Sequence, residues 1–136
     1  EMRGADAGGY KSLCALPALW TGILYCSDSL DETLKITSGI EFEDLLNFRK
    51  EVCKIGLNAE LNGYKGWQLA KEVMEISKNG LKHRKKINSF GDDENIHLSF
   101  LEELISHKKS NAASMIEKYY KNEKINIELL FNEQSF

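Results

Sequence analysis

The sequence predicts a mainly α fold, with one N-terminal strand followed by about six helices. Apolar residues recur at the three- and four-residue spacing of helices through most of the chain, whereas residues 1–6 read as an extended strand. A single proline, Pro17, argues against long disordered linkers. With 136 residues, the chain has the length of one domain with one hydrophobic core.

Composition excludes several classes of protein. The net charge of −3 argues against a nucleic-acid partner or an anionic membrane surface. No run of residues approaches the ~20 apolar residues of a membrane span, and no charged-then-apolar signal segment opens the chain. The chain has three cysteines, an odd number, and no CxxC pair. This pattern favours reduced thiols and a cytoplasmic location. Cys14 and Cys26 are twelve residues apart, which is ~18 Å on one continuous helix and too far for a disulfide.

The first six residues carry the candidate site. In an extended strand Glu1 and Arg3 point the same way, ~6–7 Å apart. A carboxylate beside a guanidinium suits a metal ion held next to an anionic substrate, while Asp6 is expected to brace the following turn. The chain offers no partner strands for this segment and does not begin with Met. We therefore expect it to be a piece of a longer protein.

The first helix is predicted over residues 10–25, after the glycine turn at residues 7–9. It is apolar on nearly every face, so we expect it to be buried, with Trp20 and Tyr25 in the core rather than lining a substrate site. Pro17 within it is expected to kink the helix or to mark a restart.

The rest of the chain is predicted to be helical with polar breaks. Ser27 or Asp28 is expected to cap a helix that ends near Thr37. Residues 41–53 form an amphipathic pattern whose apolar stripe is Phe42, Leu45, Leu46, Val52 and Cys53. A loop is predicted over residues 56–66 and a helix over 67–82. Two further helices follow, one capped by Asp92 or Asp93 and one capped by Ser110 or Asn111 that ends near Tyr120. The apolar tail over residues 125–131 is expected to dock on the rest of the chain.

Other polar clusters are interpreted as ordinary surface features. The basic run over residues 82–86 is expected to be a solvated helix end rather than a nucleic-acid patch. Residues 92–94 lack the spacing of a calcium loop and indicate a helix start. The spacing of the three histidines, His83, His97 and His107, fits no metal motif. No Ser/His/Asp or Cys/His arrangement can be supported from spacing.

Two segments carry a resemblance to a known family. EMRGAD at residues 1–6 and LCALPA at residues 13–18, followed by Trp20, Gly22 and Tyr25, resemble the glutamate–cysteine ligases of plants and alphaproteobacteria. Residues 79–84 and 100–120 resemble the family's last helices more loosely. The resemblance implies one C-terminal segment, 1–136, of a larger enzyme with a glutamine-synthetase-like α+β fold. Residues 1–6 would be its active-site strand and residues 10–136 its helical region.

The resemblance also implies a chemistry. ATP would phosphorylate the γ-carboxylate of glutamate, and cysteine would displace the phosphate, which is the first step of glutathione biosynthesis. Glu1 would then be a ligand of Mg²⁺ or Mn²⁺, and Arg3 would be a catalytic residue that binds glutamate and the transferred phosphoryl group. The family commonly has arginines where this chain has Lys11 and Ser12, so no binding role is assigned to Lys11.

The implied partners are glutamate, cysteine, ATP and the upstream remainder of the same enzyme, and a homo-oligomer stays open. Without that remainder the chain is expected to be inactive. Two alternatives also stay open: a free-standing helical interaction module without chemistry, and a related ligase that uses another amine in place of cysteine.

Overall fold

The computed structural model describes residues 8–121, so the predicted strand over residues 1–6 and the predicted tail over 125–131 lie outside the described part. The six α-helices found there confirm the prediction of a mainly α fold. The elements, in chain order, are α1 (Tyr10–Leu24), α2 (Ser27–Thr37), α3 (Phe42–Ile55), the 3₁₀ turn η1 (Gly56–Asn58), β1 (Glu60–Leu61), β2 (Tyr64–Lys65), α4 (Gly66–Arg84), the 3₁₀ turn η2 (Glu94–Leu98), α5 (Ser99–Ser106) and α6 (Asn111–Lys121).

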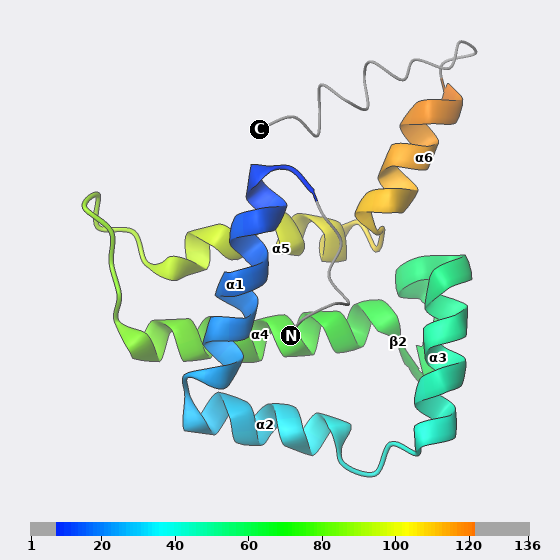
Figure 1. Cartoon of the computed structure of the whole chain (residues 1–136), viewed down its shortest axis with the longest axis horizontal. Helices are drawn as coiled ribbons and strands as arrows, with labels where there is room; N and C mark the ends of the chain where they lie inside the picture. The colour runs from blue at the N-terminus through cyan, green and yellow to red at the C-terminus, as the bar shows by residue number, and fades with distance from the viewer. Residues whose placement is uncertain (1–7, 122–136) are drawn as a thin grey trace.

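The crossing of α1 over α4 forms the centre of the described fold (Figure 1). The two helices meet at Gly22 and Gly80, where a Cβ atom added to Gly80 would overlap the carbonyl oxygen of Gly22. Close by, the hydroxyl of buried Ser77 on α4 donates to the Leu19 carbonyl of α1 over 2.8 Å. Glycine is required at this contact because the two backbones touch directly.

The hydrophobic core lies beside this crossing. Ala18 of α1, Leu81 of α4 and Leu98 of η2 form one buried cluster, and Leu81 and Leu98 are fully buried. Leu19 and Leu101 pack against the cluster from α1 and α5. The core is therefore built between α1, α4 and the segment of η2 and α5.

The first helix is less buried than predicted. It contacts α4, η2, α2 and α5, but Trp20 is 37% exposed and Tyr25, which follows it, is 72% exposed. The prediction that these two aromatic residues belong to the core is therefore wrong. The buried residues of the helix are Ala15, Ala18, Gly22 and Ile23, whereas large apolar side chains on its other faces, such as Leu13 and Leu24, are exposed. The helix runs on through Pro17 without a restart.

No single helix in the described range combines the length and apolarity needed to cross a membrane. Only α1 and α2 taken together pass that test, across a bend of 94°.

The segment over residues 56–66 contains regular structure, so its prediction as a plain loop is wrong. The turn η1 is followed by a two-residue hairpin in which Glu60 pairs with Lys65 and Leu61 pairs with Tyr64. Asn62 and Gly63 have φ angles of 51° and 85°, and two positive φ angles in a two-residue loop define a type I′ turn. The Asn-Gly pair was the sequence signal for this hairpin.

The helix caps are partly as predicted. Asp93 caps η2 by accepting from the Asn95 backbone N–H over 2.8 Å, and the Ser110 hydroxyl accepts from the Ala113 N–H over 3.1 Å. Both outcomes confirm one of the two candidates predicted at each helix start. At α2 the prediction is wrong, because Cys26 is the N-cap.

The apolar stripe of α3 is uncovered within the described residues. No residue of the helix is buried, and Phe42, Leu45 and Ile55 are 71%, 48% and 52% exposed. The helix packs on η1 and β1, at the edge of the molecule in Figure 1. The predicted pattern is therefore present, but the face that it marks has no partner there.

Candidate functional site

The predicted site residues Glu1 and Arg3, and Asp6 after them, precede the described range, so their pairing stays a prediction. The helix that follows begins at Tyr10 as predicted, with Gly9 as its N-cap in an extended conformation. The Gly9 carbonyl accepts from the Ser12 N–H over 2.9 Å and opens the first helical turn. The structure thus defines the helix directly after the predicted site.

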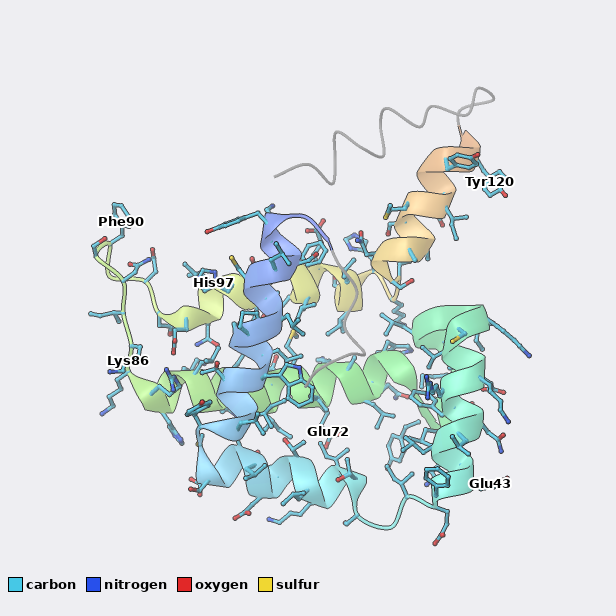
Figure 2. The ribbon with its side chains drawn as sticks, viewed as in Figure 1. Glu43, Glu72, Lys86, Phe90, His97 and Tyr120 are labelled. Atoms are coloured by element: carbon cyan, nitrogen blue, oxygen red, sulfur yellow. The ribbon has the colours of Figure 1, made fainter. Side chains whose placement is uncertain are left out.

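An open groove of about 700 Å³ runs between α2 and α4. Its lining includes Glu32 and Lys35 from α2, and Lys71, Glu72 and Glu75 from α4. Figure 2 shows Glu72 on the side of α4 that faces α2. Charges of both signs alternate along the groove, so it presents no concentrated field toward an anion or a cation.

A second hollow, of about 290 Å³, lies between α1, α4 and α5 and is lined almost wholly by apolar side chains, among them Leu19, Val73 and Leu104. The one charged side chain in its lining is Lys109. A site of this composition has no paired acid and base, so it offers no general acid–base chemistry.

Three side chains capable of binding a metal meet where the start of α2 approaches the end of α4. Cys26 is the N-cap of α2, Asp28 lies in its first turn, and His83 lies in the last turn of α4. The Cys26 Sγ and His83 Nδ1 atoms are 3.4 Å apart, and one ligand atom from each of the three residues lies within 4.8 Å of the others. Cys26 is half-buried, and the other two side chains are exposed.

This cluster is a Cys/His arrangement that sequence spacing did not support. Cys26 and His83 are 57 residues apart, so no local motif contains both. Their contact depends on how α2 packs against α4, where the buried Ser29 hydroxyl donates to the Ile76 carbonyl over 3.1 Å. Sequence spacing could not reveal it, because known Cys/His metal motifs are recognised by short separations.

The environment of Cys26 favours its thiolate. Hydrogen bonding by Ser29, and then by His83, lowers the pKa of the Cys26 thiol to about 7. The start of a helix favours a negative charge, because its first N–H groups have no partner within the helix. The thiolate, which is the form of cysteine that binds metals, is therefore well populated at neutral pH.

The basic run over residues 82–86 is a helix end, as predicted. Helix α4 ends at Arg84, whose Nε lies 2.9 Å from an oxygen of Glu94 and whose guanidinium lies 5.4 Å from the centre of the Tyr25 ring. Glu94 raises the pKa of Arg84 through this hydrogen bond. In Figure 2 the connection beyond Lys86 extends outward to Phe90, which is 89% exposed. Asp93 caps a helical turn and Glu94 pairs with Arg84, so the predicted helix start is present at these residues.

Comparison with known proteins gives consistent relatives. A glutamate–cysteine ligase of Medicago truncatula is 33% identical over 133 residues, which is 98% of this chain and 25% of the relative. The Solanum lycopersicum enzyme is 34% identical over 120 residues, covering 88% of this chain and 22% of the relative. Glutamate–cysteine ligase A of Oryza sativa subsp. indica is 42% identical over 84 residues, covering 62% of this chain and 17% of the relative. No family model and no solved structure matches the chain.

These relatives establish that the chain is related to ligases. More particularly, it is a homologue of one segment of plant glutamate–cysteine ligases, which confirms the predicted family. The chain spans about a quarter of the length of the Medicago relative and less of the other two.

The predicted cytoplasmic location is wrong. The relatives are named as chloroplastic enzymes, which points to a plastid. The three cysteines are free in the structure, as expected. Free thiols indicate a reducing compartment, but they do not specify which one it is, so the step from cysteine usage to the cytoplasm had no physical basis.

Proposed function

We propose that the chain is part of an ATP-dependent ligase that joins the γ-carboxylate of L-glutamate to L-cysteine through γ-glutamyl phosphate, the first step of glutathione biosynthesis. The observation that carries the proposal is the 33% identity to a glutamate–cysteine ligase over 98% of the chain. An alignment that extends over nearly the whole chain at this identity is difficult to explain for an unrelated helical module. The relatives are named glutamate–cysteine ligases, which also favours cysteine over another amine.

In this proposal Glu1 and Arg3 act on the transferred phosphoryl group. The carboxylate of Glu1 would hold Mg²⁺ or Mn²⁺, which take oxygen ligands, and the metal would neutralise charge on ATP. The guanidinium of Arg3 would pair bidentately with the γ-carboxylate of glutamate and with the developing phosphate. Both groups stabilise charge by position, which is the main requirement of phosphoryl transfer.

The helical part would support this site. The segment with Glu1 and Arg3 leads directly into α1, and α1 is fixed on α4 by the contact between Gly22 and Gly80. A helix held by its backbone is a firm base for residues that must lie within a fraction of an ångström of productive geometry.

We also propose that the site is completed by the rest of the enzyme, of which this chain is a C-terminal portion. A single carboxylate does not hold Mg²⁺ firmly, and the chain spans about a quarter of its Medicago relative. The 136 residues alone are therefore expected to be inactive.

The test is an assay of the full-length protein with ATP, glutamate, cysteine and Mg²⁺, in which γ-glutamylcysteine and ADP are quantified by mass spectrometry. ATP-dependent formation of γ-glutamylcysteine that stops without a divalent metal is the expected result. Ligation that proceeds with another amine but not with cysteine would identify the related ligase instead. A protein that consumes no ATP with any amine would contradict the proposal.

Substitutions in the same protein test the role of Arg3. Arg3→Ala and Arg3→Lys should each lower kcat/KM by ~10²-fold or more, because both remove the planar fork that stabilises the developing charge. Lys11→Ala is the matched control, since Lys11 is an exposed cation on α1 with no assigned role. Unchanged kinetics in both Arg3 variants would remove this residue from the site.

A further inference from the structure

We propose that Cys26, Asp28 and His83 bind one zinc-class divalent ion at the junction of α2 and α4. This site differs from the one proposed for Mg²⁺ at Glu1, both in its ligand chemistry and in its place in the chain. It does not depend on the proposed ligase activity.

The spacing of the ligand atoms fits a tetrahedral ion. Zinc lies about 2.3 Å from a thiolate sulfur and about 2.0–2.1 Å from an imidazole nitrogen, so a tetrahedral angle places those two atoms about 3.6 Å apart. The observed separation of Cys26 Sγ and His83 Nδ1 is 3.4 Å. One carboxylate oxygen of Asp28, an exposed residue, lies within 4.8 Å of a ligand atom of each of the other two residues.

The ligands stand on two helices that are already held together. Cys26 and Asp28 belong to the first turn of α2, and the buried Ser29 of that turn is hydrogen-bonded to the Ile76 carbonyl of α4. His83 lies two turns further along α4. Arg84, the cation next to His83, is paired with Glu94, so its charge is partly compensated. A bound ion would therefore meet a preformed pair of helix ends.

The donor set selects the class of ion. Sulfur, nitrogen and oxygen donors together suit Zn²⁺ and disfavour Mg²⁺, which demands oxygen ligands in octahedral geometry. Binding of the ion would displace the proton of the Cys26 thiol, because metals bind the thiolate form of cysteine. Three protein ligands leave the fourth tetrahedral position to water, and the exposure of Asp28 and His83 gives the ion an open entry path.

The test uses Co²⁺ as a coloured probe of tetrahedral thiolate sites in the full-length protein. Addition of one equivalent should produce a thiolate-to-cobalt absorption band in the near ultraviolet and visible bands typical of tetrahedral Co²⁺, and Zn²⁺ should remove both. Cys26→Ser should abolish the near-ultraviolet band. His83→Gln and Asp28→Asn should each weaken binding by at least the ~10–100-fold that the loss of an outer-shell partner costs.

Three matched variants leave the site intact: Cys53→Ser replaces an exposed cysteine elsewhere, Asp31→Asn an acid on the same helix, and His107→Gln another exposed histidine. All three should keep the band. Zn²⁺ should also protect Cys26 from alkylation by iodoacetamide, as read by mass spectrometry, which gives a result even if one variant folds poorly. A wild-type protein without the band, a band that persists in Cys26→Ser, or unprotected Cys26 would each overturn the proposal.

Discussion

Helix α1, predicted to be apolar on nearly every face, and helix α3, predicted to be amphipathic, both carry an apolar face, but the two helices have opposite roles in the fold. The first meets α4 so closely that Gly22 and Gly80 bring backbone against backbone, next to the buried hydroxyl of Ser77. The third exposes its apolar stripe, including Phe42 at 71% and Leu45 at 48%, and buries no residue. An apolar pattern thus indicates which face of a helix can be covered, whereas the neighbouring elements decide whether it is covered.

The contrast also separates two sources of stability. At the α1–α4 crossing, stability depends on steric fit and on a buried hydrogen bond that few substitutions can preserve. At α3 the apolar side chains already face solvent. Their removal therefore changes the buried apolar area, and with it the stability, only slightly. Substitutions placed in the two helices should therefore differ strongly in cost.

The largest effect is expected for Gly80→Ala. The new methyl group would overlap the Gly22 carbonyl oxygen, so the two helices must separate, at a cost of about 3 kcal/mol in the free energy of unfolding. Urea unfolding followed by circular dichroism measures this cost. The control is Asn79→Ala on the exposed face of the same helix, which should change little. Equal stability of the two variants would show that the crossing is not close.

A smaller effect is expected for Ser77→Ala. The substitution removes the interhelical donor to the Leu19 carbonyl, which should cost about 1 kcal/mol. Ser106→Ala removes an exposed hydroxyl whose partners, the Glu103 carbonyl and the adjacent His107 ring, are local, so it should cost less than about 0.5 kcal/mol. The difference between the free energies of unfolding of the two variants measures the contribution of the interhelical hydrogen bond. A difference near zero would show that this bond does not stabilise the fold.

The smallest effect is expected for Phe42→Ser on α3. Because this side chain is 71% exposed, its loss should change the free energy of unfolding of the 136-residue chain by less than about 0.5 kcal/mol. The same urea experiment measures it. A cost approaching that of Gly80→Ala would mean that the stripe of α3 is covered in solution, and the contrast between the two helices would fail.

The sequence predicted the helices well because their signals are local. Periodic apolar residues and flanking breaks placed α1, α2 and α4 within about two residues of their observed bounds. The hairpin was missed because Asn62 and Gly63 were interpreted as part of a glycine-rich loop, although Asn-Gly between short β-prone runs is a turn signal. The family was identified from the resemblance of residues 1–25, which no periodicity could have supplied.

The candidate sites were predictable only where a motif is continuous in the chain. Glu1 and Arg3 came from one six-residue segment, and they remain a prediction because that segment lies outside the described residues. The contact of Cys26 with His83 was not predictable, since it joins residues 57 apart through the packing of α2 on α4. Exposure of Trp20 was missed for a related reason: a helix that is apolar all round does not reveal which faces lack a neighbour.

The meeting of two main chains at Gly22 and Gly80 has a consequence for how this protein tolerates sequence change. Where helices touch through side chains, successive replacements can shift their angle by degrees as volumes change. Here the distance between the two helix axes is set by main-chain atoms in contact. Substitutions cannot increase the volume of the main chain by small steps. Substitutions elsewhere therefore have little effect on the direction of the N-terminal end of α1. Surface positions can diverge without changing the orientation of the residues that lead into that helix.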